Sequence, residues 1–284
     1  VAMRDAEGRW ISPLARTNRH FYDEIVLKRD RGVTATPIGV VWDRANGYVP
    51  LYFGTSVWDF FAPTELEKTM WAFNSHVFRP YGPNDSYATS RFGDVFDIIT
   101  NDAGEEFLRT YPVLMPVGDV RIDAAFAAKL KAYAEKGGTL VLNAALLLKY
   151  PGFLDEAFLG AAIGAEAVRS EGSYSLLSGR LVLEETPYEY RPLKPRPGVR
   201  TLAVTADDAE APVITVNEVG RGRVILTAPD NMKVKGSLTE MLRLFDDLVG
   251  TLRNESLPIR VKADADVEYA ICRSETSWLV YFNN

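Results

Sequence analysis

The sequence predicts an α/β fold with a mostly parallel sheet and helices on both of its faces, followed by the start of an antiparallel β domain. Three short apolar runs alternate with two helix patterns between residues 92 and 145. Joints of only a few residues between strands and helices indicate a parallel sheet that is covered on both faces. Three short strand patterns without intervening helices follow residue 257, which predicts antiparallel pairing there.

The stretch from 92 to 145 supplies the centre of the predicted sheet. Its strands are the apolar runs at 95–99, 112–117 and 139–142. Asp102 is expected to cap a short helix, because Glu105 then takes the third helical position of a capping box. Asp123 is expected to cap a longer helix, which the pair Gly137-Gly138 ends.

Further elements precede this centre. Ser12 and Pro13 begin a helix that extends to about residue 28, since serine caps a helix and proline suits its first turn. Residues 36–42 are predicted to form the first strand of the sheet. Thr64 and Glu67 make a second capping box, which opens a helix that extends to about residue 77.

The pattern becomes weaker after the centre. Residues 154–163 fit one helix, and the proline-rich residues 172–212 predict irregular β structure. Residues 213–219 and 223–227 read as a hairpin. Ser237 is expected to cap a last helix, whose apolar residues recur at helical spacing.

These elements divide the chain into three parts. Residues 1–32 are predicted to be a linker helix that follows a missing upstream domain. Residues 33–256 form the α/β domain, and residues 257–284 begin a C-terminal β domain. A valine at position 1 and a strand pattern that stops abruptly at the last residue lead us to expect an excerpt from a longer polypeptide.

Composition excludes several classes of partner and cofactor. The net charge is −6, with 38 acidic and 32 basic residues, so a nucleic-acid surface is not expected. No apolar run approaches the length of a membrane span. Cys272 is the single cysteine, which excludes an internal disulfide and a multi-cysteine zinc site, and one cysteine assigns no compartment.

The glycine motif Gly220-Arg221-Gly222 joins two predicted strands, whereas a dinucleotide-binding fingerprint needs a strand followed by a helix. No cofactor is therefore expected.

The turn after the second central strand, where this fold would carry a catalytic nucleophile, has none. The turn Pro116-Val117-Gly118-Asp119-Val120 contains no serine or cysteine, so acyl chemistry there has no attacking group. The acidic pairs along the chain are better explained as solvated surface than as metal ligands. We therefore assign no catalytic residue and no metal ligand.

A binding site is predicted at one edge of the sheet, because ligands of open parallel sheets lie outside the carboxyl ends of the strands. Asp43, Asp119 and Asn143 each follow a predicted strand. In the aromatic segment that leaves the same edge, Tyr52 and Trp58 are suited to stack on a sugar ring, while Asp43 or Asn143 bonds its hydroxyls. The alternative is that these aromatic residues only pack their loop onto the sheet or onto a neighbouring domain.

Four segments carry a resemblance to a known family. They are T-P-I-G-V-V-W-D at 36–43, G-D-V-F-D-I-I at 93–99, Y-P-V-L-M-P-V-G at 111–118 and G-G-T-L-V-L-N at 137–143. In this order they resemble the middle, trimerisation domain of family 42 β-galactosidases and of related multidomain glycoside hydrolases. That domain is flavodoxin-like and similar in fold to class I glutamine amidotransferases, but it lacks their catalytic cysteine.

The resemblance implies a non-catalytic module. Its expected roles are packing on an upstream (β/α)8 barrel, homo-oligomerisation and a share of the carbohydrate site. The catalytic carboxylates of such proteins lie on the barrel, so no acid of this chain corresponds to them. The alternative hypothesis is a free-standing protein of amidotransferase-like fold that binds a sugar or another small ligand.

Overall fold

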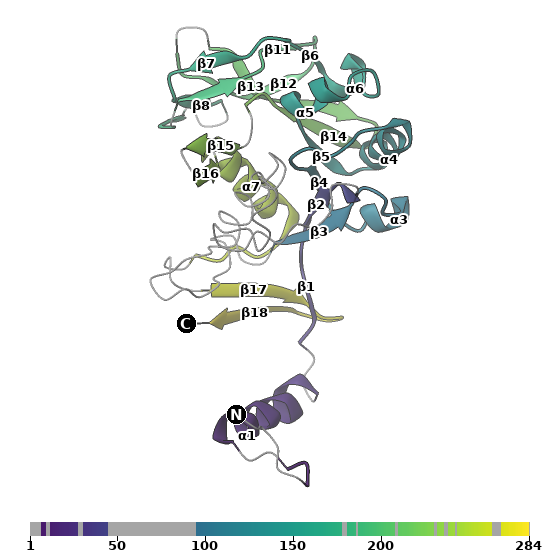
Figure 1. Ribbon diagram of the computed structural model, residues 1–284, viewed down its shortest axis with the longest axis vertical. Coiled ribbons are helices and arrows are strands. Elements are labelled where there is room, and N and C mark those ends of the chain that lie inside the picture. Colours follow the sequence, from purple (N-terminus) through teal and green to yellow (C-terminus); the bar gives the residue numbers. More distant parts are fainter. Residues whose placement is uncertain are drawn as a thin grey trace, which may run out of the picture. The chain divides into compact units, whose positions relative to one another are not determined.

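The computed structural model divides the chain into two compact units, one made of Val1–Ala35 with Ala263–Asn284 and the other of Thr36–Lys262 (Figure 1). The residues that the structure describes are 7–9, 12–27, 31–44, 95–177, 181–185, 187–207, 210–229, 232–235, 238–241, 243–262 and 268–283. Tyr52, Trp58 and the helix predicted after Thr64 lie outside them. No helix in the described ranges is long and apolar enough to cross a membrane.

A large mixed sheet forms the centre of the larger unit. Within the described residues it has nine strands in the order β3-β2-β4-β5-β14-β13-β12-β8-β9. Their bounds are β2 (Ile38–Trp42), β3 (Phe96–Thr100), β4 (Val113–Pro116), β5 (Thr139–Asn143), β8 (Tyr174–Leu176), β9 (Leu181–Leu183), β12 (Arg200–Thr205), β13 (Pro212–Val219) and β14 (Gly222–Thr227). The five strands from β3 to β14 pair in parallel, and those from β14 to β9 pair antiparallel.

The fold is therefore α/β as predicted, but the sheet is mixed rather than mostly parallel. The hairpin of β13 and β14 explains the difference. Its second strand, β14, also pairs in parallel with β5, from Arg223 opposite Thr139 to Thr227 opposite Asn143. The hairpin predicted over 213–219 and 223–227 is thus confirmed, and what its local pattern does not reveal is that its second strand joins the parallel strands.

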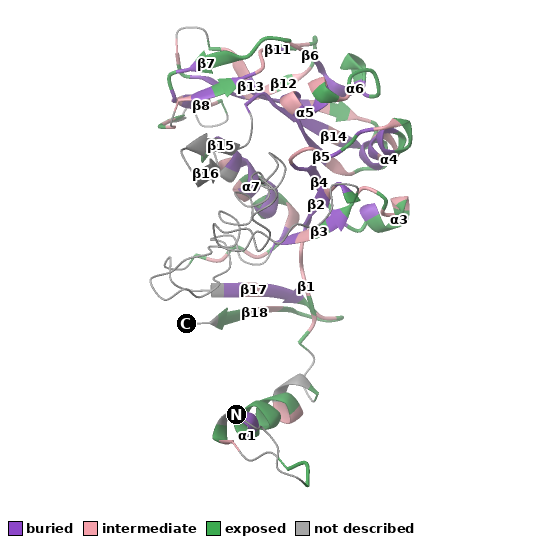
Figure 2. Ribbon diagram, in the orientation of Figure 1, coloured by how far each residue is buried: buried purple, intermediate pink, exposed green. Residues whose placement is uncertain are grey.

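The parallel strands form because their residues are apolar on both sides. All four residues of β4 are buried, as are four of the five in β2 and in β5 (Figure 2). Packing around β2 is close: a Cβ atom added to Gly39 would lie 2.9 Å from Leu114 Cδ2 and 3.0 Å from Tyr111 Cγ. This tight contact leaves no room for a side chain at position 39.

The helices of the larger unit connect and cover these strands. Within the described residues they are α3 (Glu105–Leu108), α4 (Ala124–Glu135), α5 (Ala144–Lys149), α6 (Glu156–Leu159) and α7 (Arg243–Ser256). The prediction for α4 is confirmed: Asp123 Oδ1 accepts a hydrogen bond from Phe126 N over 2.9 Å, and Gly137 follows the helix with φ 117°. Buried Tyr133 of α4 donates its hydroxyl hydrogen to Tyr111 O over 2.8 Å, which ties the helix to the start of β4.

Three local predictions are wrong. Asp102 does not cap α3, whose N-cap is Gly104 without a side-chain bond; Asp102 instead contacts Thr100 and Arg44. The helix predicted over 154–163 is limited to α6, because Gly160 turns the chain with φ 82°. The last helix does not begin at Ser237: residues 238–241 form a strand, and α7 starts at Arg243.

Short two-stranded sheets accompany the main sheet. They pair β6 (Ala161–Ile163) with β11 (Leu193–Pro195), β7 (Val168–Ser170) with β10 (Tyr188–Tyr190), and β15 (Met232–Lys235) with β16 (Leu238–Met241). The proline-rich region predicted as irregular β structure contains the five strands β8 to β12, each three to six residues long.

The smaller unit contains the first helix and a sheet built from both ends of the chain. Its elements are α1 (Pro13–Phe21), the π-helical turn η1 (Tyr22–Val26), β1 (Val33–Thr34), β17 (Glu268–Arg273) and β18 (Trp278–Asn283). Ser12 caps α1 as predicted. The strands pair antiparallel in the order β1-β17-β18, so the last two predicted strands are confirmed, whereas residues 259–262 form no strand.

Candidate functional site

Polar side chains follow the carboxyl ends of the five parallel strands. In the order of the strands they are Asp102 after β3, Asp43 after β2, Asp119 after β4, Asn143 at the end of β5 and Thr227 at the end of β14. Because parallel strands all end at one edge, the three predicted site residues that the structure describes lie along the same edge.

The buried side chain of Asp43 connects the end of β2 with the loop after β4. Only 3% of the residue is exposed, and its Oδ2 accepts a hydrogen bond from the backbone nitrogen of Arg121 over 2.7 Å. Arg121 belongs to the loop after β4, the neighbour of β2 in the sheet. The carboxylate therefore holds this loop against the end of β2, a structural task that also leaves it close to any ligand at the edge.

Asp119 is more accessible and contacts the chain after α5. Its Oδ1 accepts a hydrogen bond from the Tyr150 hydroxyl over 3.1 Å, and Lys149 Nζ lies 3.5 Å from its Oδ2. The side chain is 40% exposed. Burial raises the pKa of Tyr150, and the negative charges of Asp119 and Asp43 raise it further, so the phenol remains a neutral donor at this edge.

Asn143 links three elements through one amide. Its Oδ1 caps α5 by accepting from Ala145 N over 2.9 Å and from Leu146 N over 3.3 Å. Its Nδ2 donates to Thr227 Oγ1 over 3.2 Å and to Pro229 O over 2.6 Å. The side chain uses both of its amide hydrogens and its oxygen within the protein, so it is not available to a sugar hydroxyl without rearrangement.

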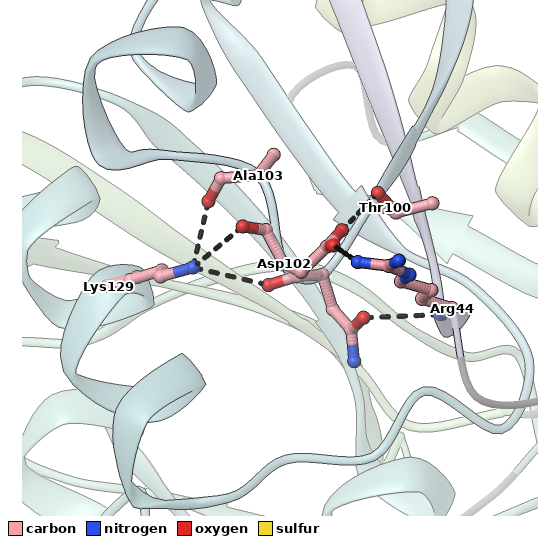
Figure 3. Close-up of polar contacts among 6 residues, drawn as sticks. Arg44, Thr100, Asp102, Ala103 and Lys129 are labelled. Carbon is pink, nitrogen blue, oxygen red and sulfur yellow. Dashed lines mark hydrogen bonds and ion pairs between the residues drawn. The ribbon is translucent and has the colours of Figure 1, made fainter.

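A polar cluster at the ends of β2 and β3 is absent from the sequence prediction (Figure 3). Arg44 pairs with Asp102 through their side chains, while its backbone nitrogen donates to Asn101 Oδ1 over 3.2 Å. Lys129 of α4 donates to three consecutive carbonyl oxygens, at 3.4 Å from Asn101, 3.3 Å from Asp102 and 2.8 Å from Ala103. The hydroxyl of Thr100 donates to Asp102 as well.

This cluster gives the edge an exposed pair of opposite charges. The Thr100 hydroxyl and then Arg44 hold the pKa of Asp102 below its ordinary value. The Arg44 side chain is 74% exposed and that of Asp102 46%. The sequence does indicate this pair in part, because both residues follow predicted strands. The capping-box spacing of Asp102 with Glu105, however, favours its interpretation as a helix cap.

The described part of this edge combines exposed charged side chains with a turn that offers no nucleophile. The turn after β4 has Gly118 at φ 75° and presents no serine or cysteine. Within the described ranges no group of three or more histidine, cysteine or acidic side chains is placed to hold a metal ion. Exposed Arg44, Asp102 and Asp119 are able to bond the hydroxyls of a ligand.

Comparisons with known proteins give a likeness of fold. No protein-family model matches the chain, and no curated protein sequence matches it. A β-galactosidase from Bacillus circulans sp. alkalophilus matches 99% of this chain with a TM-score of 0.58 and 18% identity. A β-galactosidase from Rahnella sp. R3 matches all of it (TM-score 0.54, 15% identity). Gan42B, a GH42 β-galactosidase from G. stearothermophilus, matches 96% (TM-score 0.55, 14% identity).

The chain spans about two fifths of the length of these enzymes. It covers 40% of the Bacillus protein, 41% of the Rahnella protein and 38% of Gan42B. Both units of the chain fall within the matched part, since nearly every residue is aligned.

Proposed function

We propose that this chain is a non-catalytic α/β module of a multidomain, glycoside-hydrolase-like protein. The observation that carries the proposal is the match of 99% of the chain to only 40% of a β-galactosidase. A module that aligns over its whole length with part of a larger enzyme is suited to serve that enzyme as one of its domains.

The proposed type of module is the trimerisation domain, which is flavodoxin-like and related in fold to class I glutamine amidotransferases. Strand order supports this assignment. Numbered along the chain, the parallel strands β2, β3, β4, β5 and β14 have the spatial order 2-1-3-4-5, which is the order of flavodoxin. In the proposed module, helices cover both faces of these strands.

A non-catalytic role is supported by how the edge residues are used. Asp43 and Asn143 make specific bonds that hold loops and a helix together. The turn at Gly118 has no nucleophile. We propose that catalytic carboxylates belong to a (β/α)8 barrel partner, and that the edge, with Tyr52 and Trp58, contributes contacts to a sugar.

Turnover by the isolated chain is the decisive measurement. The purified 284-residue chain should hydrolyse aryl β-galactosides no faster than a buffer blank. Light scattering should give a molar mass near three times 31.6 kDa if the module carries the trimer interface. Measurable hydrolysis that purifies with the chain would overturn the non-catalytic role. A strictly monomeric chain whose tryptophan fluorescence is saturably quenched by a sugar would favour the free-standing binding protein.

A further inference from the structure

The order of the parallel strands selects one position along the candidate edge. The chain passes from β2 to β3 and then continues with β4 on the other side of β2, so the strand order reverses between β2 and β4. In open α/β sheets a ligand binds outside the carboxyl ends of the strands, at such a reversal. The topology therefore favours the ends of β2 and β4 over the rest of the edge.

Three parts of the chain meet at this reversal. Asp43, which follows β2, accepts a hydrogen bond from Arg121 N over 2.7 Å, and Arg121 belongs to the loop after β4. In the same loop, Asp119 Oδ1 accepts from the Tyr150 hydroxyl over 3.1 Å, and Asp119 Oδ2 lies 3.5 Å from Lys149 Nζ. Lys149 ends α5, the helix that follows β5, and Tyr150 is its C-cap. These contacts hold a carboxylate, a phenol and an ammonium group side by side.

Asp119, Lys149 and Tyr150 form what we call the Asp119 cluster, and it is accessible from solvent. The exposed fraction is 40% for the side chain of Asp119 and 53% for that of Lys149. Tyr150 is half-buried. Because burial and then its contact with Asp119 raise the pKa of Tyr150, its phenol is neutral at pH 7 and keeps both a donor and an acceptor.

The surroundings of the Asp119 cluster are unfavourable for a phosphate or another anion. Phosphate sites commonly use the free N–H groups at a helix N-terminus. Here Asp123 caps α4 with its carboxylate, and Asn143 caps α5 with its amide oxygen. Among the described residues, the charged side chains of these contacts are three carboxylates and two cations: Asp43, Asp119, Asp123, Arg121 and Lys149. The excess of negative charge repels an anion.

We propose that the Asp119 cluster binds hydroxyl groups of a neutral sugar and discriminates against acidic sugars. A sugar hydroxyl both donates and accepts hydrogen bonds. Asp119 offers acceptors, Lys149 offers donors, and Tyr150 offers one of each. Charged partners strengthen such bonds. The inference rests on the proposed function, which supplies the sugar, and it adds the residues that select a neutral one.

Binding of D-galactose and of D-galacturonate to the 284-residue chain tests the inference, because the second sugar carries a carboxylate. Saturation-transfer NMR at pH 7 measures both dissociation constants. Galactose should bind about tenfold more tightly than galacturonate, since like charges in contact are costly. Asp119→Asn should weaken galactose binding about fivefold to tenfold and bring the ratio between the two sugars toward one. Tyr150→Phe, which removes one hydroxyl and no charge, should weaken galactose about fivefold and leave the ratio unchanged.

Glu255→Gln is the matched control. Glu255 also pairs with a cation at the surface, but its partner Arg223 lies near the start of β14, at the opposite edge of the parallel strands. This variant should bind both sugars like the unmodified chain. Should Asp119→Asn fail to fold, Tyr150→Phe and the ratio measured on the unmodified chain decide.

The possible failures are distinguishable. Galactose binding that Asp119→Asn and Tyr150→Phe leave unchanged, or galacturonate binding as tight as that of galactose, would overturn this inference alone. A chain that binds no galactose would overturn it together with the proposed sugar contact. Neither result affects the non-catalytic role, which only turnover of aryl galactosides by the chain would overturn.

Discussion

The two halves of the nine-stranded sheet are held together in different ways. In the parallel half, strands such as β4 are buried along their whole length, and their ends carry the polar residues of the candidate site. In the antiparallel half, β8 and β9 are short, and Val182 of β9 is 60% exposed. Burial is therefore most continuous in the middle strands of the parallel half, whereas in the antiparallel half it is concentrated in β13 and part of β12 and declines toward β9.

A core truncation should separate the two halves most clearly. Leu114 of β4 is fully buried, so Leu114→Ala removes apolar contacts and leaves a cavity. We expect it to lower the free energy of unfolding by about 3–5 kcal/mol. Val182→Ala should change it by less than about 0.5 kcal/mol, because that side chain is largely exposed. Chemical denaturation of both variants provides the measurement, and equal losses would contradict the difference between the halves.

The same difference explains how much of the fold the sequence predicts. The parallel strands appear as apolar runs between helix signals, and Asp123 caps α4 as its spacing indicates. The hairpin of β13 and β14 is also recognised, but the strands of three residues before it are too short to give a clear alternating pattern. Ser237 shows another limit: the apolar residues after it fit a helix locally, but residues 238–241 pair with β15 in a separate two-stranded sheet.

The candidate site is predictable to a similar extent. Asp43, Asp119 and Asn143 each stand at or just after the carboxyl end of a strand. Because the carboxyl ends of parallel strands share one edge of the sheet, the sequence places these three residues at that edge. Arg44 and Asp102 also follow strands, but that their side chains pair depends on how two loops approach each other, and the capping-box spacing of Asp102 favours a different interpretation.

Two helix caps allow a second comparison, in which the expected losses of stability are smaller. Asn143 caps α5 and also bonds Thr227 and Pro229 in the interior. Asn143→Ala should cost about 2–3 kcal/mol, because it removes a cap and leaves buried acceptors unmatched. Asp155 caps α6 through Phe158 N, and its contact with Lys131 lies on the surface, so Asp155→Ala should cost about 1 kcal/mol. Thermal or chemical unfolding of the two variants tests the ranking; an Asp155 variant that loses as much as the Asn143 variant would contradict it.

Alkaline pH should weaken two parts of the larger unit alike, the start of β4 in the nine-stranded sheet and the two-stranded sheet of β7 and β10. Burial raises the pKa of Tyr111 to about 12, with Asp97 adding to the effect, and burial raises the pKa of Tyr188 to about 12 as well. The unfolded chain ionises near pH 10, so the stability from each neutral phenol is complete below pH 10 and is lost as the pH approaches 12. At pH 11 the loss is about 1.4 kcal/mol for each tyrosine.

Denaturation curves between pH 9 and 11 measure this loss. Tyr111→Phe and Tyr188→Phe should each reduce the pH dependence by the same amount, although Tyr111 precedes β4 of the nine-stranded sheet and Tyr188 lies in β10 of a two-stranded sheet. If either variant keeps the full alkaline loss of the unmodified chain, the raised pKa of that tyrosine is not the cause.

The same two substitutions should have opposite effects at pH 7. The Tyr111 hydroxyl donates to Asp97 Oδ2 over 3.0 Å, so Tyr111→Phe loses a hydrogen bond to a carboxylate and should cost about 1 kcal/mol. The buried Tyr188 hydroxyl makes no hydrogen bond of good geometry within the described residues, although Ser170 lies near enough to lower its pKa slightly against the effect of burial. Tyr188→Phe removes this unmatched polar group and should be neutral or stabilising by up to about 1 kcal/mol. Urea unfolding at pH 7 distinguishes the two, and a loss of stability in Tyr188→Phe would show that its hydroxyl is hydrogen-bonded in solution.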